Sequence, residues 1–162
     1  MTSEMHEHLA KVRNAIQSAR LVLSQLGFVD DSSNVVVIGF MAQGIEHHEA
    51  ILALIGQDKV GSAFALARPV VEGMYRGLWI NLCAADREVQ HFIENDEIRL
   101  SVGGMAEALD DRYGANFYRD LKTRTWDILN SLTHTGMLQL AQRFTKHEIK
   151  SSYTAGQIFE IT

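Results

Sequence analysis

Apolar side chains recur every three or four residues along almost the whole chain, while signals for β-strands are nearly absent. In residues 3–26, for example, Leu9, Val12, Ile16 and Leu23 form one stripe at helical spacing. The chain has no Asn-Gly or Asp-Gly hairpin dipeptide and no sustained alternation of apolar and polar residues. Pro69 is its only proline. These patterns predict an all-α fold.

The helical stretches are expected to pack into one bundle of about five to seven helices, a single domain over residues 1–162. The stretches expected to be helical are Ser3–Leu26, Asn34–Gly56, Ser62–Ala84, Asp86–Glu94, Glu97–Asp111, Phe117–Leu121, Thr125–Phe144 and Ala155–Ile161. Gly136 is expected to interrupt the stretch Thr125–Phe144 directly after His134. Gly27 and Gly114 are expected to close helices, because glycine adopts the left-handed conformation common after a last turn. The segment Ser62–Ala84 is apolar nearly all round, which predicts the most buried helix, with a kink at Pro69.

Composition places the chain among ordinary globular proteins. Hydrophobic residues make up 46% and charged residues 22% of 162 residues, enough for a real core. The single cysteine, Cys83, excludes an internal disulfide and favours a reducing, cytoplasmic compartment. No run approaches the ~18 apolar residues of a membrane span, so no membrane partner is expected. Because the last segment stops without a polar end, we expect that the chain is C-terminally truncated.

Charge is unevenly distributed along the chain. The net charge is −5, which disfavours a general nucleic-acid coat protein. Residues 112–150 nevertheless contain seven basic residues and three acidic ones, and are net positive. This segment is consistent with a solvated face, and also with a local footprint for an anion or RNA.

Arg68, Glu72 and Arg76 are spaced four residues apart, on one face of an otherwise apolar helix. Two guanidiniums and a carboxylate in apolar surroundings are costly unless they pair. One interpretation is a structural ion-pair network that fixes the register of the helix. The other is that Glu72 orients one arginine while the second binds a phosphate or carboxylate of a ligand.

Asn130 and His134 also lie one helical turn apart and interrupt an apolar stripe near Trp126. A hydrogen-bonded core histidine is one interpretation. The alternative is a catalytic site in which His134 transfers a proton and Asn130 sets its tautomer or binds the substrate. The candidate catalytic residues are therefore His134, Asn130, Arg68 and Arg76.

The string Glu46-His47-His48-Glu49 suggests metal binding at first sight. Neighbouring helix residues point about 100° apart, so His47 and His48 cannot bind one ion together. No two histidines of the chain are three or four residues apart. We therefore predict no metal and no cofactor, and expect His48 to face inward as a partner of Glu72 or His134. A small-molecule or metal site built from His48, Glu72 and His134 is kept as a weaker alternative.

Three sequence strings together resemble a family of uncharacterised bacterial helical proteins. They are Ser62-Ala63-Phe64-Ala65-Leu66-Ala67-Arg68-Pro69-Val70-Val71-Glu72, Arg76-Gly77-Leu78-Trp79 and Leu129-Asn130-Ser131-Leu132-Thr133-His134-Thr135-Gly136. The family shares an Arg-Pro-x-x-Glu helix, a following Trp and a late Thr-His-x-Gly. This resemblance covers about residues 40–150 and implies no activity.

The chain is also distantly similar to the HEPN superfamily of helical bundles. Many HEPN proteins are metal-independent ribonucleases of toxin, abortive-infection and CRISPR systems, with an Arg, commonly a following Asn, three further residues and then His. Asn130 and His134 match the second half of that pattern, whereas Leu129 stands at the place of the arginine. The similarity implies RNA as substrate, with Arg68 or Arg76 in place of the missing guanidinium.

Two functions compete on this sequence. The favoured one is a non-catalytic helical interaction module of a bacterial stress or defence system, which has a protein partner. The alternative is a HEPN-like ribonuclease, active or degenerate, so whether the chain is an enzyme stays open. Convergence of Arg68, Glu72 and His134 at a solvent-accessible cleft favours the enzyme, whereas complete burial with mutual pairing favours the module. A homodimer is expected, because the apolar segment Ile158–Ile161 and the apolar helices exceed what a small bundle covers.

Overall fold

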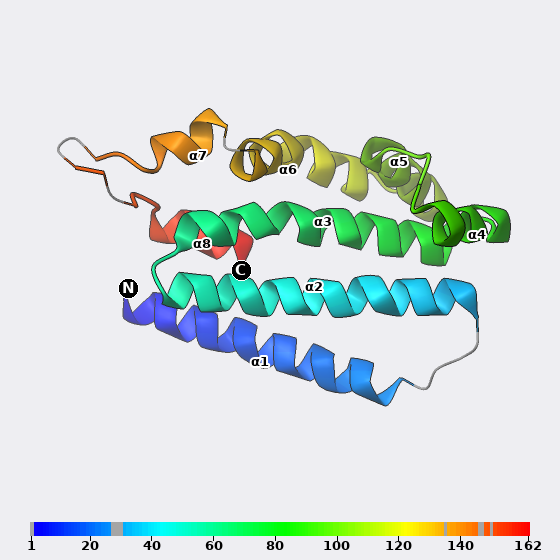
Figure 1. Ribbon diagram of the computed structural model, residues 1–162, viewed down its shortest axis with the longest axis horizontal. Coiled ribbons are helices and arrows are strands. Elements are labelled where there is room, and N and C mark those ends of the chain that lie inside the picture. The colour runs from blue at the N-terminus through cyan, green and yellow to red at the C-terminus, as the bar shows by residue number, and fades with distance from the viewer. Residues whose placement is uncertain (1, 27–30, 135, 146–147, 150) are drawn as a thin grey trace.

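The computed structural model describes residues 2–26, 31–134, 136–145, 148–149 and 151–162, and it is all-α (Figure 1). The described residues form eight helices: α1 (Ser3–Gln25), α2 (Ser32–Gly56), α3 (Val60–Leu82), α4 (Asp86–Asn95), α5 (Val102–Tyr113), α6 (Phe117–Thr133), α7 (Met137–Ala141) and α8 (Ala155–Ile161). Within these residues, strand-type pairing is limited to one isolated bridge between Phe144 and Ile149. The predicted all-α class is confirmed. None of these helices combines the length and apolar character that a bilayer crossing requires.

α3 is the central helix of the bundle. Figure 1 shows α2 and α3 side by side, with α1 on the outer side of α2 and with α5 and α6 on the other side of α3. α3 contributes the longest set of buried residues, as its apolar character all round predicts. It stays helical through Pro69. Its two sides therefore face different partners, α2 on one side and α5 and α6 on the other.

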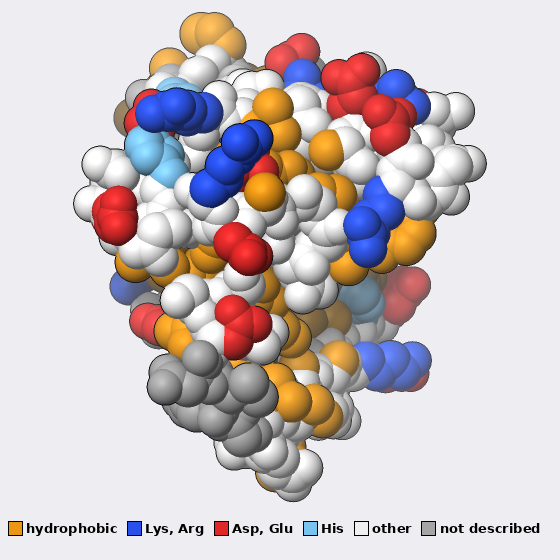
Figure 2. All heavy atoms as spheres, turned by 90° about the vertical axis from the view of Figure 1, so that its right-hand side faces the viewer, with side chains coloured by type: hydrophobic (Ala, Val, Ile, Leu, Met, Phe, Trp, Pro, Cys, Tyr) orange, Lys and Arg blue, Asp and Glu red, His pale blue; other side chains and the backbone are white. Residues whose placement is uncertain are grey.

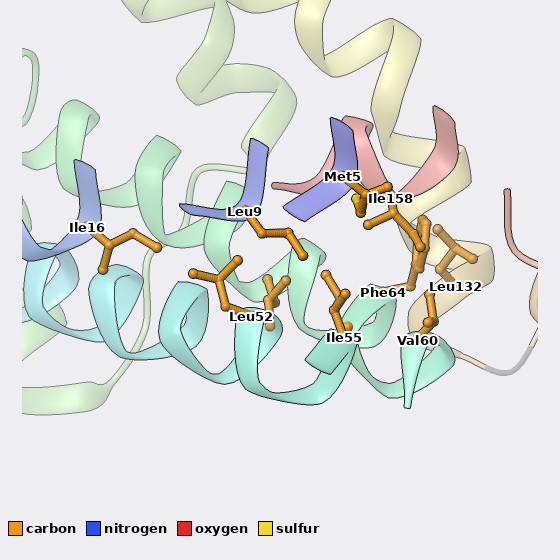
Figure 3. Packing of buried hydrophobic residues seen from close by; sticks show 11 residues of the cluster. Met5, Leu9, Ile16, Leu52, Ile55, Val60, Phe64, Leu132 and Ile158 are labelled. Atoms are coloured by element: carbon orange, nitrogen blue, oxygen red, sulfur yellow. The ribbon is translucent and has the colours of Figure 1, made fainter. Parts of the chain in front are cut away.

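The core has two parts along α3. One lies at the end where α3 begins and joins α1, α2, α6 and α8; Figure 3 shows it, with Ile158 of α8 next to Met5 of α1. The other surrounds Tyr75 and Trp79 and joins α3 to α4 and α5. Phe159 and Ile161 also pack against the first part. The expectation that the segment Ile158–Ile161 leaves an uncovered apolar surface is wrong, because α8 folds back into the core.

Several helix ends follow the predicted signals. Gly114 has a φ of 62° and closes α5 in the left-handed conformation, as expected. The expected start of that helix at Glu97 is wrong: α5 begins at Val102, where the Ser101 hydroxyl accepts the Gly104 N–H at 3.2 Å. The expected closure at Gly27 lies outside the described residues.

The segment from Phe117 to Phe144 divides differently from the prediction. α6 is continuous from Phe117 to Thr133, so the expected break after Leu121 is absent from this helix. The expected interruption at Gly136 is confirmed, since α6 ends at Thr133 and the separate short helix α7 begins at Met137. A Cβ atom at Gly136 would lie 2.9 Å from the backbone of Ser131, so the chain turns here in a space that only glycine fits. His134 is the C-cap residue of α6.

We predict that Tyr75→Phe lowers the free energy of unfolding by about 1–3 kcal/mol. Tyr75 is fully buried and its hydroxyl donates to the carbonyl oxygen of Tyr118 at 2.8 Å, so phenylalanine removes a buried hydrogen bond between α3 and α6. Denaturant unfolding measures the loss. Tyr113→Phe is the control, because Tyr113 is exposed. Equal unfolding midpoints for both variants would show that the bond contributes nothing.

Tyr75 also makes the free energy of unfolding depend on pH in the alkaline range. Burial, helped by the Asp110 carboxylate, raises the pKa of Tyr75 to about 12. The pKa of Tyr75 in the folded protein lies above its value of about 10 in the unfolded chain. The contribution of Tyr75 to the free energy of unfolding is therefore complete below pH ~10 and is lost as the pH rises toward 12.

Candidate functional site

The ion pairs predicted on α3 are present. Arg76 Nη2 lies 2.6 Å from Glu72 Oε1, and Arg68 Nε lies 3.7 Å from Glu72 Oε2. The side chains of Arg68 and Glu72 are 22% and 24% exposed, and that of Arg76 is 34% exposed. The network is therefore only partly buried, and solvent reaches all three side chains.

α6 brings the second pair of candidate residues to the same place. Arg68 Nη1 contacts His134 Nε2, although the two residues are 66 positions apart in the chain. The Arg68 guanidinium also lies 5.2 Å from the centre of the Trp126 ring, which suits a cation–π contact. The result is a continuous line of side chains, His134–Arg68–Glu72–Arg76, along the seam between α3 and α6. We call this line the α3/α6 seam.

The ends of the α3/α6 seam differ in their surroundings. His134 is exposed and caps α6, where its backbone N–H donates to the carbonyl of Asn130 at 3.0 Å. Asn130 is half-buried one turn earlier. Its side-chain oxygen Oδ1 is buried and has no hydrogen-bond partner among the described residues, and the same holds for the Nε atoms of Arg68 and Arg76. Buried polar atoms are nearly always bonded, so these three atoms are the unsatisfied polar groups of the α3/α6 seam.

The contact with Arg68 sets the tautomer of His134. A guanidinium has only N–H donors, so Nε2 must be the accepting nitrogen of the ring. In the neutral imidazole the proton is therefore on Nδ1. This arrangement keeps a lone pair on Nε2 and directs it into the α3/α6 seam, at a guanidinium that can also bind an anion.

His48 lies away from the other candidates. It lines a groove between α1, α2 and α3 together with Val70, Gly73 and Gly77. At 100° per residue these α3 positions lie roughly opposite Glu72 on the helix. The expected partnership of His48 with Glu72 or His134 is therefore wrong, because α3 stands between them. The His48 ring instead bonds the carbonyl oxygen of Gly44, one turn earlier, at 2.9 Å.

Metal-binding side chains and the Cys83 thiol are the other reactive groups to consider. Among the described residues no three His, Cys, Asp or Glu side chains are grouped as a metal ion would require. Glu49 pairs with Arg20 of α1 at 2.5 Å. Burial raises the pKa of the Cys83 thiol, which opposes formation of the reactive thiolate.

Sequence reasoning missed the role of Trp126 in this site. The residue was noted only as a neighbour of the apolar stripe, yet its ring holds the Arg68 guanidinium. The signal that could have found it is spacing, since Trp126, Asn130 and His134 follow one another at four-residue intervals. Asp110, whose fully buried carboxylate lies at the start of α6, was also missed.

Comparison with known proteins identifies the family of this chain. Residues 41–159 match the model of a family described as a family of unknown function, DUF6988, and the chain belongs to that family. The match includes every residue of the α3/α6 seam. No curated protein and no solved structure matches the chain.

We predict that Glu72→Gln lowers the free energy of unfolding by about 1–2 kcal/mol, between the ~0–1 of exposed pairs and the ~3–5 of buried ones. The substitution leaves two partly buried guanidiniums without their counter-charge. Glu7→Gln is the control, because Glu7 forms a pair of the same spacing with Lys11 at 2.7 Å on an exposed surface. Urea unfolding compares the two, and equal midpoints would mean that the network is effectively solvated.

Proposed function

We propose that this protein is a HEPN-like ribonuclease that works without a metal ion and whose catalytic pair is His134 and Arg68. The observation that carries the proposal is the contact between Arg68 of α3 and His134 at the end of α6. A guanidinium next to an exposed imidazole suits both the binding of a phosphodiester and the transfer of a proton.

The burial of Leu129 supports the idea that Arg68 takes the role of the arginine in the HEPN pattern. Leu129 occupies the position where the HEPN pattern has arginine, and its side chain is buried. A guanidinium at that position would enter the core. Arg68, from the facing helix, reaches the same histidine from the exposed side, so the chain retains a guanidinium at His134.

The proposed reaction is attack of an RNA 2′-hydroxyl on the adjacent phosphorus. The RNA phosphate draws the Arg68 guanidinium from His134, because a bond to an anion is stronger than one to a neutral imidazole. The released Nε2 accepts the 2′-hydroxyl proton as the new 2′-oxygen–phosphorus bond forms. The bond from phosphorus to the 5′-oxygen breaks, and that oxygen takes a proton from a water molecule; the hydroxide that remains takes the proton from His134, which returns to the neutral imidazole. Arg68 stabilises the charge that develops on the phosphoryl oxygens, and the products are a 2′,3′-cyclic phosphate and a 5′-hydroxyl.

The test is incubation of the protein with single-stranded RNA in the presence of EDTA. We expect fragments that end in a cyclic phosphate, and no cleavage of DNA of the same sequence, because DNA lacks the attacking hydroxyl. Intact RNA after incubation with folded protein, or cleavage that EDTA abolishes, contradicts the proposal.

A second candidate is a non-catalytic interaction module of a bacterial stress or defence system, in the cytoplasm. The observation that favours it is the groove on the α1 side of α3, which Lys, Arg, Asp and Glu do not line, because contiguous apolar surfaces can bind other proteins. A protein that leaves RNA intact under all conditions supports this candidate over the first.

A further inference from the structure

Arg76 is the cation of the α3/α6 seam that the proposed reaction does not use. Its Nη2 donates to Glu72 Oε1 at 2.6 Å, and this is the one hydrogen bond that its side chain makes with the described residues. A guanidinium has five N–H donors. Donors on the Nη atoms of Arg76 therefore remain beyond the pair with Glu72, on a side chain that is 34% exposed.

Glu72 holds the Arg76 guanidinium close to that of Arg68. Arg68 Nε lies 3.7 Å from one oxygen of the Glu72 carboxylate, and Arg76 Nη2 lies 2.6 Å from the other. The two guanidiniums are therefore separated by a single carboxylate group, which also offsets their mutual repulsion. Because Glu72 is less exposed than Arg76, 24% against 34%, the carboxylate does not shield Arg76 from solvent.

α3 and α6 run antiparallel along the seam. Arg68 contacts His134 at the end of α6, whereas the Tyr75 hydroxyl donates to the carbonyl oxygen of Tyr118 near its start. Arg76 follows Tyr75 in α3 and therefore lies toward the start of α6. An RNA strand whose cleaved bond lies at His134 can extend along the seam, and its next phosphate is then the anion that comes to Arg76.

The two helices of the seam are positively charged in an acidic protein. α3 has two basic residues and one acidic residue, and α6 has three basic and two acidic residues. Together they are net positive, whereas the whole chain has a net charge of −5. By contrast, Figure 2 shows Lys and Arg side chains interspersed with Asp and Glu at the α4 end of the bundle. The local charge therefore favours the approach of a phosphate strand to the seam.

We propose that Arg76 binds the RNA phosphate next to the one that is cleaved. The α3/α6 seam is then a site for two phosphates, with the scissile phosphate at Arg68 and its neighbour at Arg76. This inference rests on the proposed ribonuclease. The neighbouring phosphate takes no part in bond making, so Arg76 binds substrate and transition state equally. Loss of such a contact raises KM and leaves kcat unchanged.

The experiment uses short oligonucleotides with a single ribonucleotide, so that each has one cleavable bond. A dinucleotide has the scissile phosphate alone. Two trinucleotides add one phosphate, on the 5′ or on the 3′ side, and each is also made with a neutral methylphosphonate at the added position. We expect the wild-type KM for one charged trinucleotide to be about 10–100-fold below that of its neutral counterpart, the range for one hydrogen bond to a charged group.

The variant Arg76→Ala should lose this difference, so that its KM for the charged trinucleotide equals that for the neutral one. Its kcat and KM for the dinucleotide should stay at the wild-type values. Arg76→Lys keeps the charge without the planar fork, and should retain part of the difference. Arg13→Ala is the matched control, because Arg13 is exposed on α1, beyond α2 from the seam (Figure 1); it should behave as the wild type.

Circular dichroism checks that the helices of each variant are intact, and Arg76→Gln replaces Arg76→Ala if that protein loses helix. Equal wild-type KM values for the charged and neutral trinucleotides overturn the inference and leave the ribonuclease intact. A charge effect that Arg76→Ala retains overturns it as well, since another residue then binds the phosphate. So does a lower kcat of Arg76→Ala on the dinucleotide, because Arg76 would then act through Glu72 on Arg68. A wild-type protein that cleaves neither these substrates nor long RNA contradicts the ribonuclease itself, and the inference with it.

Discussion

RNA cleavage is expected to fall by about 10²–10⁴-fold when His134 is replaced by alanine, the range for loss of a positioned acid or base. Arg68→Ala should cost about 10²–10³-fold, because the guanidinium stabilises charge in the transition state. Because the two groups act on the same step, the double variant should be little worse than His134→Ala alone. Initial rates of cleavage of one labelled RNA measure all three variants.

The same variants separate catalysis from stability. His134 is exposed at the end of α6, so its replacement should change the free energy of unfolding by no more than ~0.5 kcal/mol. If His134→Ala cleaves RNA as fast as the wild type, the catalytic role is excluded. If activity and stability fall together, the histidine has a structural role.

The largest effect on stability is expected from Asp110→Asn. Asp110 is fully buried, and its carboxylate accepts the backbone N–H groups of Tyr118 and Arg119, each at 2.9 Å. It also accepts Arg119 Nε at 3.2 Å. These bonds fix the first turn of α6, the helix that carries Asn130 and His134. Asparagine replaces one acceptor oxygen with an NH₂ group that faces N–H donors, so we expect a clearly lower urea midpoint at pH 7.

The effect of Asp110→Asn should depend on pH. Burial alone would raise the pKa of Asp110, but the N–H groups and the Arg119 guanidinium outweigh burial and lower it. The pKa of Asp110 in the folded protein lies below its value of about 3.9 in the unfolded chain. The stabilisation by Asp110 is therefore complete above that pH and is lost as the pH falls further. The difference in free energy of unfolding between wild type and variant should narrow below pH ~4. Asp111→Asn is the control, because Asp111 is exposed; equal midpoints for the two variants at pH 7 would refute the prediction.

Local signals were enough to predict most of the helices. Apolar spacing, caps and glycines are read within a few residues, and the ends of α2 at Gly56 and of α5 near Gly114 follow from them. The boundaries between 117 and 144 were predicted less well. There the interruption at Gly136 was predicted and is confirmed, whereas the expected break after Leu121 is wrong because α6 is continuous from Phe117 to Thr133.

The candidate site was predicted in part. Four-residue spacing placed Arg68, Glu72 and Arg76 on one face of a helix, and Asn130 and His134 on one face of another. It does not determine which helices pack together, and that packing brings Arg68 rather than Arg76 to His134. The position of His48 was predicted wrongly for the same reason, since spacing does not determine which face of α3 packs against α2.

Asp110 was not predicted because aspartate is seldom fully buried, so composition and periodicity assign it to the surface. Its role depends on backbone N–H groups eight and nine residues later, at the start of α6. A polar residue that accepts hydrogen bonds from the backbone of another helix leaves no periodic signal in the sequence.

The central claim is that Arg68 supplies the guanidinium at His134, and chemical rescue of Arg68→Ala tests it most directly. RNA cleavage by this variant is measured with increasing guanidinium ion at concentrations that leave its circular dichroism unchanged, with urea as the uncharged comparison. We predict that guanidinium restores cleavage by Arg68→Ala, that urea does not, and that neither restores cleavage by His134→Ala. Cleavage by Arg68→Ala at the wild-type rate, or no rescue of the folded variant by guanidinium, would contradict this claim.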